Sequence, residues 1–146
     1  MPLPQGYEVS SDPTRIDIDY VHRYLSEVSY WAHGIPRDVV ARSLANSIVF
    51  GLYKTDGAQL GFARVITDRA TFAWLADVFI DPALQGKGLG KGLLDAIFVH
   101  PDLQGLRRFM LATQDAHSLY QKYGFGPPPN PDRLMAIVKA DIYRQP

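Results

Sequence analysis

The fold is decided by residues 74–94, which read W-L-A-D-V-F-I-D-P-A-L-Q-G-K-G-L-G-K-G-L-L. The apolar run that opens this stretch predicts a strand, and the apolar run after the glycines predicts a helix. Between them, Gly86, Gly88 and Gly90 leave the start of the helix without side chains. Bare N–H groups at the positive end of a helix dipole form a site for a phosphate anion. The alternative is a glycine-rich turn that binds nothing.

Two common phosphate-binding loops do not fit these glycines. The P-loop pattern needs Ser or Thr after its lysine, but a glycine follows Lys91. The dinucleotide pattern G-x-G-x-x-G needs glycine at position 91 or 93, where lysine and leucine stand. The pattern that remains is Gln85-x-x-Gly88-x-Gly90.

This remaining pattern resembles the Q/R-x-x-G-x-G/A signature of the GCN5-related N-acetyltransferase (GNAT) family. A second string, A-x-x-L-Y-x-x-x-G-F at residues 116–125, is similar to the other signature of that family and puts its tyrosine at Tyr120. The two strings stand in the family's order, and the resemblance extends over residues 7–140.

The resemblance implies that acetyl-coenzyme A (acetyl-CoA) is the cosubstrate, with no metal. The backbone of the strand would contact the pantetheine arm, and the glycine turn would hold the pyrophosphate. A contact from Thr113 stays open, because many family members carry asparagine at that position. The residues implied in acetyl-CoA binding are Val78, Phe79, Ile80, Gln85, Gly86, Lys87, Gly88, Leu89, Gly90, Lys91 and Thr113.

Tyr120 is the expected general acid. When an amine attacks a thioester, a thiolate of pKa ~8.5 leaves, and a phenol of pKa ~10 is still protonated at neutral pH and can supply the proton. The alternative is a core tyrosine that bonds to a backbone carbonyl.

Asp77 is the second expected catalytic residue. A carboxylate in an apolar strand is costly unless it is paired or protonated, so its place suggests a function. The strand also resembles the L-E-D-x-x-V version of polyamine acetyltransferases, in which the acid before the aspartate is the base, but that position is Ala76 here. Three roles stay open for Asp77: base, anchor for the substrate ammonium, or ion pair with Arg64.

The acceptor amine is expected to meet Tyr30, Trp31, His33 and Arg64. The first three lie in the connection between the first two predicted helices, which often forms a wall of the acceptor site in the family. Aromatic faces there could hold a cation. The alternative is a helix end whose aromatic residues only fill the core.

The element order predicts an α/β fold with a mixed sheet and helices on both faces, in the order β-α-α-β-β-β-α-β-α-β, which is also the order of the GNAT fold. We expect one domain over residues 1–146, since no linker or repeat interrupts it. The strands are expected at residues 7–10, 48–53, 60–67, 71–80, 106–113 and 134–140. The helices are expected at residues 16–31, 37–46, 87–99 and 116–123.

Composition narrows the functional classes. A formal net charge of zero argues against nucleic acid as the main partner. The absence of cysteine excludes disulfides, thiolate metal sites and a cysteine nucleophile. No signal peptide and no apolar run of ~18 residues is evident, so we expect a cytoplasmic protein without a membrane partner.

The sequence therefore predicts an acyltransferase that moves acetyl from acetyl-CoA to a primary amine, of a small molecule, by direct attack. The alternatives are a non-catalytic acyl-CoA sensor and an enzyme that acetylates a protein or peptide amine. A homodimer is an open option.

Overall fold

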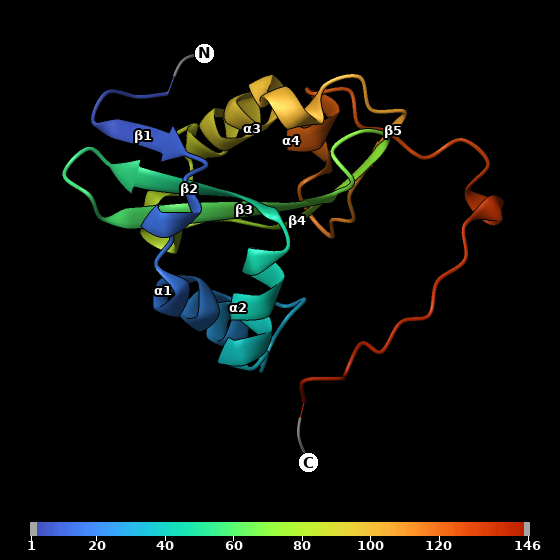
Figure 1. Cartoon of the computed structure of the whole chain (residues 1–146), viewed down its shortest axis with the longest axis horizontal. Coiled ribbons are helices and arrows are strands. Elements are labelled where there is room, and N and C mark those ends of the chain that lie inside the picture. Colours follow the sequence, from blue (N-terminus) through green and yellow to red (C-terminus); the bar gives the residue numbers. More distant parts are fainter. Residues whose placement is uncertain (1–2, 145–146) are drawn as a thin grey trace.

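The computed structural model describes residues 3–144 as a five-stranded sheet with helices on both faces (Figure 1). The predicted α/β class is confirmed. The strands are β1 (Tyr7–Ser10), β2 (Ile48–Lys54), β3 (Gln59–Thr67), β4 (Phe72–Ile80) and β5 (Arg108–Met110). The α-helices are α1 (Ile18–Arg23), α2 (Arg37–Ala45), α3 (Leu89–Val99) and α4 (His117–Gln121).

The sheet has the strand order β1-β2-β3-β4-β5. The first four strands pair antiparallel, and β5 pairs parallel to β4 after the crossover through α3. The β4–β5 pairing covers only three positions, from Phe72 opposite Arg108 to Trp74 opposite Met110. Strand β4 continues to Ile80, so its second half has a neighbour on the β3 side alone.

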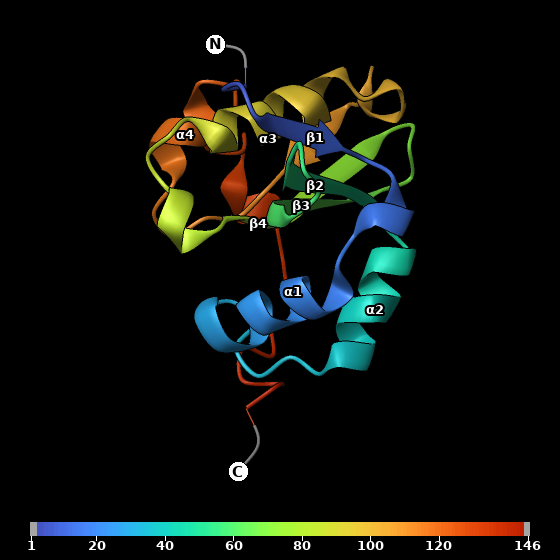
Figure 2. The ribbon, with the colours of Figure 1, turned by 90° about the vertical axis from the view of Figure 1, so that its left-hand side faces the viewer.

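Two apolar clusters hold the helices against the sheet. Helix α3 covers one face, where Leu93, Leu94 and Ile97 are fully buried against Phe50. Helices α1 and α2 cover the other face (Figure 2), and their cluster contains Phe79 of β4. The central strand β2 is buried at six of its seven positions because both layers cover it.

The first predicted helix is shorter than expected. Instead of running to position 31, α1 ends at Arg23 and a π-helical turn follows at Tyr24–Val28. Buried Ser29 closes this turn: its N–H bonds to the Tyr24 carbonyl, and its Oγ donates to the Leu25 carbonyl and accepts from the Ala32 N–H. Local side-chain bonds of this kind compete with continued α-helix.

The predicted last strand, at residues 134–140, is wrong. Residues 134–139 have no regular secondary structure and residue 140 lies in a turn, and none of them pairs with a strand within residues 3–144. Met135 and Ile137 are 96% and 94% exposed. They belong to what we call the C-terminal arm, residues 126–142, which leaves the body after Phe125 (Figure 1, orange to red). Tyr143, just beyond it, packs against the α1–α2 cluster. Strand β5 is also shorter than the predicted 106–113, since without a strand on its outer side it pairs only with β4.

Candidate functional site

The glycine turn presents open backbone at the start of α3. Gly86 and Gly88 have φ angles of +85° and +77°, which residues with a Cβ rarely adopt. A Cβ at either position would meet no atom within 4 Å, so the space in front of the turn is free. Gly88 is the N-cap residue and offers no side-chain bond to the helix. The first-turn N–H groups of α3 therefore remain available to an anion.

Gly90 lies where the first turn of α3 meets α4. A Cβ at Gly90 would lie 3.6 Å from Leu119 Cδ2, in ordinary contact. The Leu119 side chain of α4 therefore lies beside the first turn of α3. The two strings singled out in the sequence thus meet in space at Gly90 and Leu119.

Strand β4 carries a β-bulge at the site. Phe62 of β3 pairs with Phe79 and Arg64 pairs with Ala76, so Asp77 and Val78 together face the single residue between. Asp77 has a left-handed φ of +56°, which aspartate tolerates better than most residues. The bulge lies beyond the last β4–β5 pair, where the strand's edge on that side has no strand neighbour.

The Asp77 carboxylate is held by two donors. Arg64 Nε donates to Oδ2 and Trp31 Nε1 donates to Oδ1, each at 2.8 Å. The side chains of Arg64 and Asp77 are 16% and 9% exposed, so the ion pair is largely buried. Of the three roles expected for Asp77, the ion pair with Arg64 is present in the structure.

Three aromatic side chains form a wall beside Asp77, namely Tyr24, Tyr30 and Trp31. We call them the aromatic wall. Tyr30 and Trp31 meet edge to face at 5.0 Å, and Tyr24 stacks on Phe79 at 3.8 Å. The Tyr30 hydroxyl accepts the Gln114 N–H at 3.0 Å and so reaches the loop before α4. Tyr30 and Trp31 are 52% and 40% exposed, so they do not simply fill the core.

His33 lies apart from this group. It is exposed, and within residues 3–144 no hydrogen bond or ion pair joins it to the wall. The structure therefore brings together three of the four expected acceptor-side residues, namely Tyr30, Trp31 and Arg64.

Tyr120 sits in α4 and is 8% exposed. Burial raises the pKa of its phenol to about 12, with smaller contributions from Tyr30 and Asp115. Tyr120 is therefore protonated throughout the neutral range. Helix α4 ends at Gln121, two residues before the expected end, and a turn continues to Gly124, whose φ is +97°. The Phe125 N–H bonds back to the Tyr120 carbonyl. The Thr113 hydroxyl accepts the Ala116 N–H at the other end of the helix.

Sequence reasoning missed the carboxylates around the aromatic wall. The pKa of Tyr24 is raised by burial and, to a smaller extent, by Asp115 and Asp81 nearby. Tyr20 donates to Asp81 Oδ2 at 3.2 Å. The wall thus stands in an acidic setting that favours a cation. The sequence pattern could not predict this acidic setting, because Asp81 and Asp115 occur in separate loops that only the fold brings close together.

Within the described residues, no three His, Asp or Glu side chains gather in a way that would hold a metal ion. None of the helices in residues 3–144 is long and apolar enough to cross a membrane.

Comparisons with known proteins agree on one family. Residues 45–127, more than half of the chain, match the family profile "Acetyltransferase (GNAT) domain". A protein of Gibberella zeae named "Putative acetyltransferase FG08082" is 36% identical over 80% of this chain and 76% of its own. "Serotonin N-acetyltransferase 2, chloroplastic" of Oryza sativa subsp. japonica is 26% identical over 93% of this chain and 70% of its own.

A solved structure extends this likeness to nearly the whole chain. The crystal structure of a "putative acetyltransferase belonging to the gnat family" from Xanthomonas campestris pv. campestris is 49% identical. It superposes with a TM-score of 0.94 over 98% of this chain and 99% of its own.

Proposed function

Because the chain belongs to the GNAT family and is an N-acetyltransferase, we propose that it acetylates a small primary amine with acetyl-CoA by direct attack. The observation that carries this proposal is the free second half of β4, which leads to the open glycine turn. Its residues Val78 and Ile80 pack against the apolar cluster that contains buried Tyr120. Bound acetyl-CoA supplies an acetyl group activated as a thioester.

The chain's residues fit that cosubstrate. The N–H groups at residues 86–91 suit the two phosphates, because positive φ at Gly86 and Gly88 leaves the approach clear. The free edge at Val78, Phe79 and Ile80 can add an extended arm as a strand would be added. Gln85 and Lys87 are exposed beside the turn, and Lys91 and Leu89 follow in its first helical turn.

Tyr120 would protonate the leaving thiolate. Because its pKa is raised, the phenol of Tyr120 keeps its proton at neutral pH and can act as the proton donor. The Thr113 hydroxyl accepts the Ala116 N–H. We therefore propose that Thr113 shapes the loop before α4 and contributes little to cosubstrate binding.

The acceptor would lie against the aromatic wall. Tyr30 and Trp31 expose ring surface, and carboxylates stand close by, so an ammonium group is favoured there. A ring on the amine would find apolar partners in the same wall. The rice relative, which is named for acetylating serotonin, supports an acceptor of this kind.

Asp77 would act as a positioning residue. Each of its oxygens already accepts a hydrogen bond, one from Arg64 and one from Trp31, so the carboxylate is better placed to fix the indole than to remove a proton. The amine would then lose its proton to solvent water at the open side of the site. We also propose that the whole chain is one domain and that the enzyme works in the cytoplasm.

The test is release of free CoA thiol from acetyl-CoA across a panel of amines: arylalkylamines, polyamines, amino sugars, and lysine peptides. We expect turnover with a small amine and the highest kcat/KM for one with an aromatic ring. Turnover on peptides alone would contradict the small-molecule assignment. Tight acetyl-CoA binding without release on any amine would contradict catalysis by this site.

A further inference from the structure

Three aspartates surround the aromatic wall, and they differ in what holds them. Asp77 forms the ion pair with Arg64. Asp81 accepts the Tyr20 hydroxyl and caps the short helical turn that follows β4. Asp115 is exposed, and within residues 3–144 no ion pair or side-chain hydrogen bond engages its carboxylate. Of the three carboxylates, the one on Asp115 is therefore free to bind a ligand.

Asp115 lies between the aromatic wall and the proposed general acid. The N–H of its neighbour Gln114 donates to the Tyr30 hydroxyl at 3.0 Å, which places this part of the loop against the edge of the wall. Burial is the main cause of the raised pKa values of Tyr24 and Tyr120, and the negative charge of Asp115 adds to both. The carboxylate is thus close to one phenol of the wall and to the phenol of α4.

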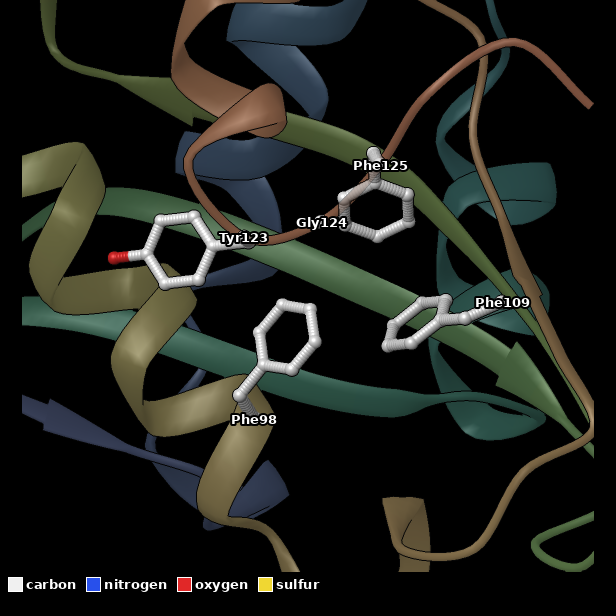
Figure 3. A pocket seen from close by; sticks show the side chains of 5 residues that line it. All are labelled: Phe98, Phe109, Tyr123, Gly124 and Phe125. Carbon is white, nitrogen blue, oxygen red and sulfur yellow. The ribbon is translucent and has the colours of Figure 1, made fainter.

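The segment that carries Asp115 is held at both ends. Before α4, the Thr113 hydroxyl accepts the Ala116 N–H at 3.1 Å. After α4, the chain packs into a group of aromatic rings around a hollow of about 120 Å³ (Figure 3), namely Phe98, Phe109, Tyr123 and Phe125. The place of the Asp115 backbone beside the wall is therefore set by the fold.

The chemistry of acetyl transfer limits what this carboxylate can bind. An ammonium group must lose a proton before its nitrogen can attack the thioester. A carboxylate paired with that same ammonium would favour its charged form and so oppose the reaction. Asp115 therefore helps turnover most when the acceptor carries a second cation, one that keeps its charge while the first nitrogen reacts.

We propose that the acceptor carries two cationic nitrogens, one of which is acetylated while the other binds the Asp115 carboxylate. This inference rests on the proposed function. The part of the acceptor between the two nitrogens would lie against the exposed rings of Tyr30 and Trp31. The attacking nitrogen forms its bond to the acetyl carbon and gives up a proton to water. As the C–S bond breaks, the thiolate takes the proton of Tyr120, which regains one from water.

A matched pair of amines tests the second cation. para-Xylylenediamine and para-methylbenzylamine share the ring and the reacting group and differ in one ammonium. An ionic hydrogen bond to Asp115 should make kcat/KM per amino group about tenfold higher for the diamine. Because the added interaction is ionic, this preference should shrink when the salt concentration is raised from ~0.05 to ~0.5 M. para-(Aminomethyl)benzoate, with a negative group in the same place, should be the poorest acceptor of the three.

Asp115→Asn tests the residue. The variant should lower kcat/KM for the diamine by about tenfold and for the monoamine by a much smaller factor, and it should abolish the salt dependence of the preference. Because Asp115 is exposed, the fold should be retained, as circular dichroism would measure. Asp56→Asn removes the same charge from the exposed β2–β3 hairpin and is the matched control. It should keep the wild-type preference.

The outcomes separate this inference from the proposed function. Absence of turnover with all amines would contradict acetyl transfer by this site and the inference with it. Turnover of both amines at equal kcat/KM per amino group would leave acetyl transfer in place and overturn the second cation. An equal loss with both amines in Asp115→Asn, or a preference that this variant retains, would overturn the assignment of Asp115.

Discussion

The indole Nε1 of Trp31 donates to Asp77 Oδ1 at 2.8 Å and joins two segments that lie 46 positions apart in the chain. One is the connection between α1 and α2, and the other is the bulge of β4. The bond fixes the aromatic wall over the strand edge to which the acetyl donor is proposed to bind. In the proposed complex, this bond would help to set the position of the acceptor relative to the acetyl group, together with the Tyr24–Phe79 stack and the Tyr30–Gln114 bond.

Trp31→Phe keeps an aromatic ring in the wall but removes the donor to Asp77. A hydrogen bond to a charged group contributes ~1.5–3 kcal/mol, so the wall should loosen and KM for the amine should rise by about tenfold. KM for acetyl-CoA should stay the same, because the glycine turn is untouched. Steady-state kinetics with each substrate varied in turn would measure both constants. An equal rise in the two KM values would indicate general damage instead.

Tyr120→Phe tests the acid. Loss of a positioned general acid costs ~10²–10⁴-fold in rate, so kcat should fall by at least about 100-fold. The dissociation constant of acetyl-CoA, from calorimetry, should change less than threefold. Tyr123→Phe is the matched control, since this phenol bonds instead to the Lys91 carbonyl and Asp95 on α3. A Tyr120→Phe enzyme with normal kcat would remove Tyr120 from the mechanism.

The stability of the fold at alkaline pH should also depend on the ionisation of Tyr120. Burial raises its pKa to about 12 in the folded state, against ~10 in the unfolded chain. A raised pKa gives stability that is fully present below pH ~10 and is lost as the pH rises toward 12. Urea unfolding of the wild type should show this loss. In Tyr120→Phe the decline between pH 10 and 12 should be smaller by about 2 kcal/mol; an unchanged decline would mean that other groups cause it.

Gly88→Ala tests the phosphate turn. Its φ of +77° makes any side chain costly, so stability should fall by ~1 kcal/mol, and the new methyl group would occupy the open space in front of the turn. KM for acetyl-CoA should rise by about tenfold. Gly105→Ala is the matched control, with φ of +69° and equally open space but outside the glycine turn. It should lose similar stability and keep the wild-type KM. If both variants raise KM alike, backbone strain rather than the turn is the cause.

What the sequence could predict depended on how local each feature is. The glycine turn before α3 and the glycine turn that follows α4 at Gly124 depend on residues close together in the chain, and the positive φ angles of Gly86, Gly88 and Gly124 appear in the structure. The bulge could not be foreseen, because nothing in the strand pattern says that Asp77 adopts a left-handed φ. The strand expected at residues 134–140 failed for a related reason: its composition suits a strand, but a strand exists only where another chain segment pairs with it.

The largely buried pair of Arg64 and Asp77 gives the last prediction. Arg64→Met leaves the Asp77 carboxylate without its cation, and removal of one partner of a buried pair costs ~3–5 kcal/mol. Asp77→Asn leaves Arg64 without its anion but keeps an oxygen that can accept from Trp31, and asparagine tolerates the left-handed φ. The double variant should therefore be more stable than Arg64→Met alone by at least about 1 kcal/mol, as urea unfolding would measure.

Kinetics of the same Asp77→Asn protein distinguish a positioning role of Asp77 from a role as the base. If Asp77 only holds Trp31, the variant should retain more than about a tenth of the wild-type kcat at neutral pH, because the amide oxygen still accepts the indole N–H. The pH profile of kcat/KM should then keep its shape. A loss of ~10²-fold or more with a flattened acid limb would instead identify Asp77 as the base and would overturn its assignment as a positioning residue.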